Sequence, residues 1–455
     1  MKTIIDGILN DLIFWMAWII IPLSMEIIPS IIGSIILVKK KLLYKEKEFR
    51  GRLPEVTIIV PVYNSASTLY ECIKSINDCT YPNELLNIIV VNNGSSDESF
   101  NIFCICQEKF KDLPMRWLSS KKGKSKALNM AIFNSEGKYI INIDSDGVLH
   151  KDAVKNMILR FERDNSINCA TGVVLVESSK IKNTKELFLR FIRECEMMEY
   201  YQAFLAGRNY EAEYNSIYTI SGAFSCFKKS LLLKTKLYNT DTISEDTHVT
   251  FQIKHLLKKK VHICENAFFF VEPIDNFDKL YTQRQRWQRG QVEISNMFFK
   301  DKLKSFSLSK FDRTVYLLLF DHTFAFPRMI WYFALICLTF LNYSLKTILS
   351  SLIVLNSLYI IISFIYSINI ISFLTPYKEM RKEYISRLYI LFIMPLYNFI
   401  VFWIRIAGII NSINRDSSWR TVTFSQERTK IKEIIKSDFN YLIGLRDKLK
   451  RIVNK

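Results

Sequence analysis

The sequence predicts an α/β domain with a mostly parallel sheet, flanked by transmembrane helices. Short apolar runs rich in β-branched residues alternate with helical stretches in the middle of the 455-residue chain. Longer apolar runs lie toward both ends of the chain. In addition, polar and acidic clusters follow two of the predicted strands, which is where sheets of this class bind ligands.

The α/β part begins with a strand over 56–63, and strands and helices alternate from there. The further expected elements are a helix over 66–77, a strand over 86–91, a helix over 98–110, a strand over 115–118, a helix over 124–134 and a strand over 139–143. The sequence contains no internal repeat and no low-complexity segment.

The apolar run 12–38 is long enough to cross a hydrocarbon core of about 30 Å at about 1.5 Å per residue. The alternative is a cleaved signal peptide. A signal peptide begins with a positively charged region, whereas this segment contains Asp6 and Asp11, and no small-residue cleavage site follows the run. A retained anchor over 1–40 is therefore favoured. Seven basic residues between 39 and 52 predict that the N-terminus is outside and the central block is in the cytoplasm.

The predicted topology of the C-terminal part is in conflict with its charge. The part contains three apolar runs, 329–343, 347–374 and 388–410. Three crossings would place the basic tail outside, although the positive-inside rule favours the cytoplasm. Either 388–410, with Pro395 and Arg405, lies at the interface or re-enters, or 314–326 adds a short crossing. We expect a cytoplasmic C-terminus. The expected regions are an interfacial linker at 300–326, a transmembrane region at 327–410 and a basic tail at 411–455.

The net charge of +18 suits either nucleic acid or an anionic membrane surface. Basic residues beside apolar runs favour the lipid bilayer, and no helix-turn-helix or aromatic-basic RNA pattern is present, so no nucleic-acid partner is expected. Nine cysteines are scattered, and Cys104 and Cys106 are too close together for a zinc pair. They are predicted to be reduced cytosolic thiols.

Three clusters suggest chemistry. Asp144-Ser145-Asp146 follows a predicted strand and suits a hard divalent cation, Mg²⁺ or Mn²⁺, the alternative being a simple turn. Ser244-Glu245-Asp246 opens the helical stretch 249–259, where acids also serve as helix N-caps. Gln283-Arg284-Gln285-Arg286-Trp287 offers a planar guanidinium and a flat ring, the alternative being an amphipathic helix at the membrane surface.

A fourth cluster is Asn92-Asn93-Gly94-Ser95-Ser96-Asp97. It follows a strand that ends Val60-Pro61-Val62-Tyr63-Asn64, and it precedes the other three clusters along the chain. That order resembles the processive family 2 glycosyltransferases, a group that includes the cellulose, chitin, hyaluronan and poly-N-acetylglucosamine synthases. The resemblance implies the nucleotide-sugar-binding fold called GT-A over 53–299, in the cytoplasm at the plasma membrane.

The resemblance also implies roles for single residues. Asp246 would be the general base of an inverting attack, and Asp144 and Asp146 would hold the metal. The nucleotide-sugar would contact Pro61, Tyr63, Asn64, Asn92, Asn93, Lys124, Asn129, Asp144 and Arg286. The acceptor would contact Gly222, Glu245, Gln283 and Trp287. Gly222 lies in Ser221-Gly222-Ala223-Phe224, for which a plain strand turn is the alternative.

The chain departs from the family at Asn92 and Asn93. The family usually has two aspartates here, and the carboxylate of one of them forms a hydrogen bond with the uracil base. Because an amide donates as well as accepts, the preferred nucleotide can shift away from uridine. The expected function is metal-dependent transfer of a hexose or N-acetylhexosamine, with a UDP-sugar favoured as donor, to a growing cell-surface polysaccharide. The alternatives are transfer of one sugar to a polyprenyl phosphate and a non-catalytic glycan-binding scaffold, and membrane partner subunits are compatible with each.

Overall fold

A computed structural model describes residues 14–43, 48–303, 325–414, 423–430 and 432–433. Its centre is one eight-stranded sheet with the strand order β3-β2-β1-β4-β7-β6-β8-β5. The strands are β1 (Val56–Val62), β2 (Leu86–Asn92), β3 (Met115–Ser119), β4 (Tyr139–Ile143), β5 (Gly147–Leu149), β6 (Cys169–Val176), β7 (Phe224–Lys228) and β8 (His262–Val271).

The sheet is mixed and mostly parallel, as the sequence predicts. β1 pairs in parallel with β2 and β4, and β2 pairs in parallel with β3. β7 is antiparallel to β4 and β6, β6 is parallel to β8, and β5 is antiparallel to β8. The register places Val62 opposite Asn92, so the ends of β1 and β2 meet at one edge.

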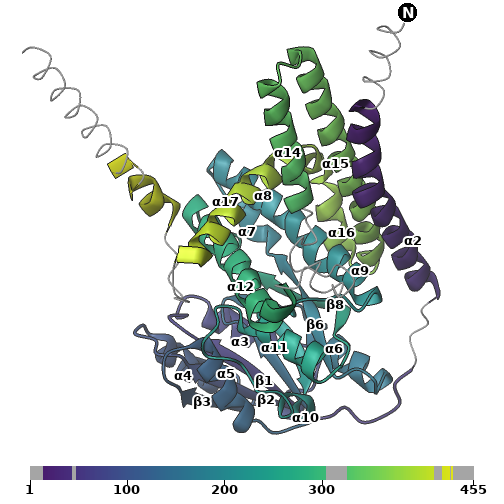
Figure 1. Cartoon of the computed structure of the whole chain (residues 1–455). Helices are drawn as coiled ribbons and strands as arrows, with labels where there is room; N and C mark the ends of the chain where they lie inside the picture. The colour runs from purple at the N-terminus through teal and green to yellow at the C-terminus, as the bar shows by residue number, and fades with distance from the viewer. Residues whose placement is uncertain (1–13, 44–47, 304–324, 415–422, 431, 434–455) are drawn as a thin grey trace, which may run out of the picture.

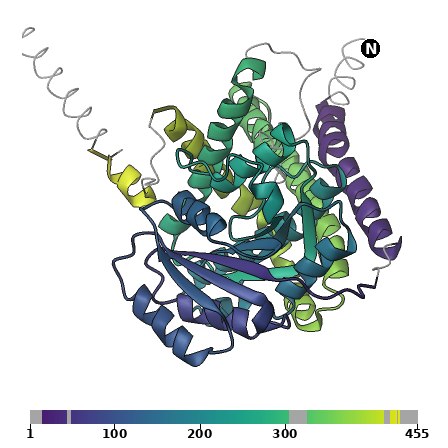
Figure 2. The same cartoon turned by 90° about the horizontal axis from the view of Figure 1, so that it is seen from below.

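Helices cover both faces of the sheet (Figures 1 and 2). In the first half of the domain they are α3 (Leu69–Asn77), α4 (Ser99–Lys109), α5 (Lys124–Phe133), α6 (Ala153–Arg163) and α7 (Ser178–Lys182). In the second half they are α8 (Leu187–Tyr200), η3 (Tyr201–Gly207), α9 (Arg208–Glu213), α10 (Lys229–Leu232), α11 (Glu245–Phe251), η4 (Gln252–Leu256) and α12 (Phe277–Leu303). A short 3₁₀ turn, η2 (Asn83–Leu85), precedes β2.

The predicted strands and helices between 56 and 143 are confirmed to within three residues at each end. They form because the central strands are mostly apolar on both faces, and every residue of β1 and β4 is buried. Such continuous apolar strands are typical of a sheet covered by helices on both sides.

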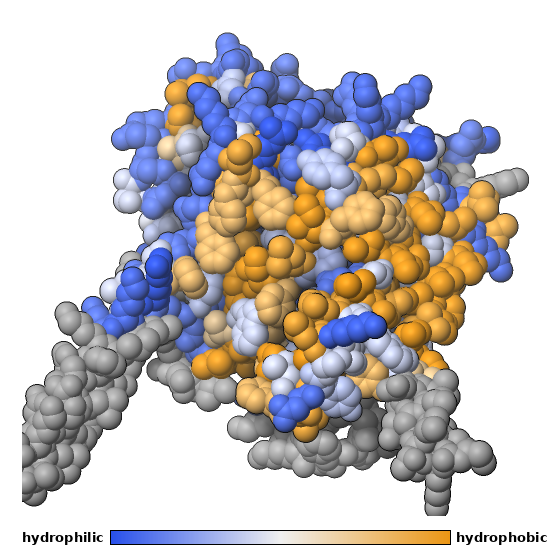
Figure 3. Space-filling view, turned by 90° about the horizontal axis from the view of Figure 1, so that it is seen from above, coloured by the Kyte–Doolittle hydropathy of each residue, from blue (hydrophilic) through white to orange (hydrophobic). Residues whose placement is uncertain are grey.

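Three helices in the described part of the chain are long and apolar enough to cross a membrane: Phe14–Leu43, Leu345–Phe373 and Met394–Asn411. The first contains η1 (Leu23–Ile27) and α2 (Ile28–Leu43), and the second is α15. The other C-terminal elements are α14 (Ala325–Phe340), α16 (Lys378–Ile385), η6 (Leu388–Phe392) and α17 (Met394–Asn414). Figure 3 shows a broad apolar surface on the side of the molecule where α14 and α15 project in Figure 1.

The N-terminal and C-terminal apolar helices form one group, because the buried Arg328 donates to the buried Glu26 at 3.0 Å. α17 packs closely on α12: a Cβ atom added at Gly408 would lie 3.1 Å from the backbone oxygen of Gln285. α17 therefore connects this group of apolar helices to α12 of the sheet domain. All but the last two residues of the predicted extra crossing at 314–326, and most of the predicted basic tail, lie outside the described residues.

Candidate active site

The carboxyl ends of β1 and β2 carry the first group of predicted site residues, and Pro61 lies buried within β1. Tyr63 is 46% exposed, and the Lys122 ammonium lies 5.1 Å from its ring centre. Asn64 adopts a left-handed conformation with φ of 51°, and its side-chain oxygen accepts from the Ser96 N–H at 2.9 Å. This edge therefore presents an aromatic ring on a turn held by hydrogen bonds.

The side-chain oxygens of Asn92 and Asn93, the two positions at which the chain departs from the family, both accept hydrogen bonds from backbone N–H groups of the protein. Asn92 Oδ1 accepts from the Ser95 N–H at 2.8 Å. Asn93 Oδ1 accepts from the Gly123 N–H, one residue before α5. The amide NH₂ group of Asn93 is thus the part of the side chain left to meet a ligand.

Lys124 joins two of the predicted clusters. Its ammonium lies 2.5 Å from Asp144 Oδ1, at the end of β4, and 3.7 Å from Glu245 Oε1, at the start of α11. Burial acts to lower the pKa of Lys124, but the carboxylates of Asp144 and Glu245 outweigh it and raise that pKa above its usual range. Lys124 therefore stays charged and holds the two acidic clusters together.

Asp246 is fixed by two backbone donors. Its Oδ2 accepts from the Gly222 N–H at 3.2 Å and its Oδ1 from the Thr247 N–H at 2.7 Å. A Cβ atom at Gly222 would lie 3.1 Å from Asp246 Oδ2, so the absence of a side chain there allows this approach. Burial raises the pKa of the neighbouring Glu245, against the opposing effect of Lys124. The two acids thus differ: Glu245 is buried against Lys124, and Asp246 is half-exposed at the site.

Asp144 and Asp146 fit a divalent cation that takes its other ligands from a substrate. Asp146 lies in the turn after β4, and although its side chain is accessible to solvent, partial burial and the nearby Asp144 carboxylate raise its pKa. A cation would relieve this repulsion. No group of three or more acidic, histidine or cysteine side chains forms a complete metal site in the described part of the chain. Magnesium commonly binds through one or two carboxylates and substrate phosphates.

α12 presents its predicted motif on one side. Gln283, Arg286 and Trp287, at positions i, i+3 and i+4, are half-buried and share a helix face. Arg284, between them in sequence, is buried on another face. The helix therefore offers an amide, a guanidinium and an indole ring together.

Gly290 brings α12 against the start of α11. A Cβ atom at Gly290 would lie 1.8 Å from Ser244 Oγ and 2.7 Å from Ser244 Cβ. Ser244 directly precedes Glu245 and Asp246, so this contact sets the spacing between the acidic cluster and the α12 motif.

Gly290→Ala is expected to lower turnover by about 10-fold or more, because the added methyl group must displace Ser244 and with it Asp246. Alanine ordinarily stabilises a helix interior relative to glycine, by about 1 kcal/mol, so low helix propensity would not explain a loss. Adding Ser244→Gly removes the clashing atoms and should restore most of the activity, because glycine is tolerated at a helix N-cap. Equal activity of Gly290→Ala and the parent protein would contradict this account.

The structure gives Asn129 other partners. Its side chain donates to the Tyr238 carbonyl at 2.8 Å and accepts from the Tyr238 N–H at 3.0 Å. Asn129 therefore holds the loop before α11, and its contact with a nucleotide stays a prediction. Sequence reasoning passed over Arg284, Glu199 and Tyr200, whose side chains meet beneath the α12 motif. Only the position of Arg284 inside the motif signalled it.

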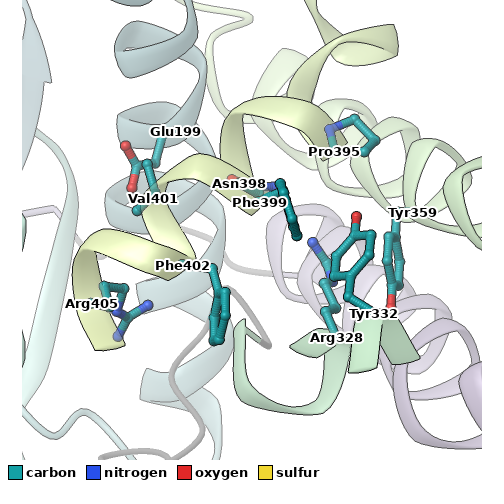
Figure 4. A pocket seen from close by; sticks show the side chains of 10 residues that line it. All are labelled: Glu199, Arg328, Tyr332, Tyr359, Pro395, Asn398, Phe399, Val401, Phe402 and Arg405. Atoms are coloured by element: carbon teal, nitrogen blue, oxygen red, sulfur yellow. The ribbon is translucent and has the colours of Figure 1, made fainter. Parts of the chain in front are cut away.

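A small cavity of about 20 Å³ lies between α8, α14, α15 and α17 (Figure 4). It is separate from the acidic clusters, and Arg328, Tyr332 and Tyr359 lie close together on one side of it. This volume holds about one water molecule, so the cavity as it stands admits no sugar.

The sequence between 57 and 235 matches the model described as Glycosyl transferase family 2. Residues 57–235 are thus similar to a glycosyltransferase family 2 domain. The matched region includes the ends of β1 and β2, Lys124 and the Asp144 to Asp146 turn, and it stops before Asp246 and the α12 motif.

The chain is also similar to curated poly-β-1,6-N-acetyl-D-glucosamine synthases. The chain is 27% identical over 286 residues to the synthase of Staphylococcus epidermidis, covering 62% of this chain and 63% of that protein. It is 26% identical over 271 residues to the synthase of Staphylococcus aureus strain COL, covering 59% and 61%. The match thus spans less than two thirds of the length of these relatives.

Among solved structures, the chain resembles a mannosyltransferase of Pyrobaculum calidifontis that was determined with GDP-mannose and Mn²⁺. The TM-score is 0.56 with 16% sequence identity, covering 87% of this chain and 98% of that chain. The likeness confirms the predicted GT-A fold.

Proposed function

We propose that this protein is a membrane-bound inverting glycosyltransferase that moves N-acetylglucosamine from a UDP-sugar to a growing cell-surface polysaccharide. The observation that carries the proposal is the link from Asp144 through Lys124 to Glu245, beside an Asp246 fixed by the Gly222 N–H. This link supports the proposal because it brings a lysine and two carboxylates together beside a candidate base. The sugar and the polymer are suggested by the curated synthases.

In the proposed reaction, Asp246 accepts the proton of an acceptor hydroxyl. The hydroxyl oxygen forms a bond to the anomeric carbon of the donor sugar as the bond from that carbon to the nucleotide diphosphate breaks. Attack opposite the leaving group inverts the anomeric centre. Lys124 and Arg286 would balance the charge on the departing diphosphate, and Trp287 would stack on the acceptor sugar.

Asp144 and Asp146 would hold Mg²⁺ or Mn²⁺, which when bound would neutralise the diphosphate. The acidic turn at the end of β4 supports this assignment, because it supplies oxygen ligands without completing a site by itself. Mn²⁺ accompanies the nucleotide-sugar in the structurally similar mannosyltransferase.

The membrane arrangement that we propose places 53–299 in the cytoplasm, after an anchor at 1–40. α14 and α15 would enter and return, and α17 would lie at the interface. In support, 44% of the most apolar window of α17 is buried within the protein, against 28% for each of the other two candidate spans. This arrangement returns the chain to the cytoplasm, where the basic tail is expected.

The proposal is tested by nucleotide release from the full-length protein in nanodiscs, across UDP-, GDP- and CDP-sugars with Mn²⁺ or Mg²⁺. Release from UDP-N-acetylglucosamine that depends on the metal and increases with a β-1,6-linked N-acetylglucosamine oligosaccharide would support it. Absence of release from every donor, with oligosaccharide and polyprenyl phosphate both supplied, would favour a non-catalytic scaffold.

Asn93→Asp is expected to strengthen binding of UDP relative to CDP by about 10-fold. One carboxylate oxygen can keep the bond from the Gly123 N–H, and the other would replace the NH₂ donor with an acceptor for the uracil N3–H. A hydrogen bond to a charged group contributes about 1.5–3 kcal/mol. Calorimetric titration with both nucleotides measures the ratio, with the exposed Asn101→Asp as control. An unchanged ratio would show that Asn93 does not face the base.

A further inference from the structure

We propose that Arg284 is a positioning residue that orients Gln283 and Trp287 for the acceptor and connects them to the membrane helix α17. The inference rests on the proposed function, since it concerns the acceptor side of that site. It adds a residue to which neither the motif nor the comparisons give a role.

Arg284 bridges the site and the helices behind it. Its side chain is 2% exposed and donates to Glu199 Oε2 at 2.6 Å and to Gln283 Oε1 at 2.5 Å. The same Glu199 oxygen accepts from the Tyr397 hydroxyl of α17 at 2.9 Å. One guanidinium thus links a motif side chain to α8 and, through Glu199, to α17.

Arg284 also forms one wall of the Trp287 environment. Its guanidinium carbon lies 4.3 Å from the Trp287 ring centre, at cation–π distance. Tyr200 and Phe204 approach the same ring, with centres 6.3 Å and 6.1 Å away. The indole is therefore held by three neighbours, yet it remains half-buried and keeps part of its surface accessible to a sugar.

The stability of the fold does not by itself require a buried arginine at position 284. Burying an ion pair costs desolvation that the pair only partly repays, and well-packed apolar residues often serve as well or better. Only a planar guanidinium can bond a carboxylate and an amide and also stack on an indole. A lysine in its place would keep the charge and the contact with Glu199 but lose the stacking.

Charge near Arg284 is balanced among several groups. Glu196 is 1% exposed, and burial raises its pKa to about 7 even though Arg284 acts to lower it. Its carboxylate accepts from the Ile274 N–H at 3.0 Å, just before α12. Removing the positive charge of Arg284 would therefore leave the buried Glu196 and Glu199 without its compensating charge, which makes neutral replacements poor probes.

The test is Arg284→Lys in the full-length protein in nanodiscs, with UDP release measured against UDP-N-acetylglucosamine and against a β-1,6-linked N-acetylglucosamine pentasaccharide. We expect the KM for the pentasaccharide to rise about 10-fold, while the KM for the donor and the Tm stay close to those of the parent. A purely structural role would instead lower Tm and the active fraction and leave the acceptor KM unchanged. An unchanged acceptor KM would overturn the proposal.

A pair of tyrosine variants covers the case in which Arg284→Lys does not fold. Tyr397→Phe removes one hydroxyl from the link to Glu199 and should raise the acceptor KM in the same direction, by about threefold. Tyr389→Phe is the matched control: its hydroxyl donates at 2.7 Å to Glu194, also on α8, but makes no contact with Arg284. Equal acceptor KM values for the two variants would overturn the coupling to α17.

The outcome separates this inference from the proposed function. A parent protein that releases no UDP, or whose release ignores the pentasaccharide, overturns the proposed polymerising function and the inference with it. A parent protein that responds to the pentasaccharide, beside an Arg284→Lys variant with the same acceptor KM, overturns the inference alone.

Discussion

Replacing Asp246 by asparagine is expected to lower kcat by about 10²- to 10⁴-fold, the range associated with loss of a general base. The amide cannot accept the acceptor proton. It also has one acceptor oxygen where the carboxylate uses two, so it cannot receive both the Gly222 and the Thr247 N–H groups. Single-turnover release of nucleotide from UDP-N-acetylglucosamine measures the effect.

The control for this variant is Asp241→Asn, an exposed acid five residues upstream, which should keep the activity of the parent. Binding of UDP should also persist in Asp246→Asn, because Lys124 and Asp144 are unchanged. A variant at Asp246 that retains more than about a tenth of the parent kcat would contradict the role of general base.

Asp146→Asn is expected to lower kcat/KM by at least about 100-fold, which corresponds to about 2.7 kcal/mol of transition-state stabilisation. The amide is a weaker ligand for a hard cation, so the Mn²⁺ concentration giving half-maximal activity should rise. Titration of Mn²⁺ after removal of metals with EDTA measures both values. Asp112→Asn, an exposed acid away from the site, is the control.

The same site predicts a pH dependence. Partial burial and Asp144 raise the pKa of Asp146, and a carboxylate must be deprotonated to bind a metal. As pH falls toward the raised pKa, the parent should therefore need more Mn²⁺, whereas Asp146→Asn should show little added dependence. Full activity of the EDTA-treated parent, or unchanged metal dependence in the variant, would contradict the assignment of Asp146.

The elements of the sheet domain were predictable because local pattern and tertiary position agree. β1 and β4 are mostly apolar and buried along their whole length, and both lie in the middle of a sheet covered on both faces. The candidate membrane-spanning helices were predictable from length and composition, and Phe14–Leu43 and Leu345–Phe373 lie where apolar runs predicted them. The path of α17 was not, because its packing on α12 depends on the close approach at Gly408.

The site was only partly open to prediction. The family resemblance predicted Asp144, Lys124 and Asp246 as residues of one site, but sequence alone could not show that Lys124 contacts both Asp144 and Glu245. The hydrogen bonds of Asn129 could not be predicted either, because its partner Tyr238 lies in a loop more than a hundred residues away in the sequence. In the sequence, Arg284 cannot be distinguished from the other basic residues. Its burial and its contacts with Glu199 and Trp287 are evident only in the structure.

The most direct test of the central claim is the size of the product made from radiolabelled UDP-N-acetylglucosamine by the full-length protein in nanodiscs with Mn²⁺. We predict an N-acetylglucosamine polymer that grows with time, carries β linkages and is absent with Asp246→Asn. A product limited to one sugar on an extractable polyprenyl phosphate would contradict polymer synthesis. No labelled product with either acceptor would contradict sugar transfer itself.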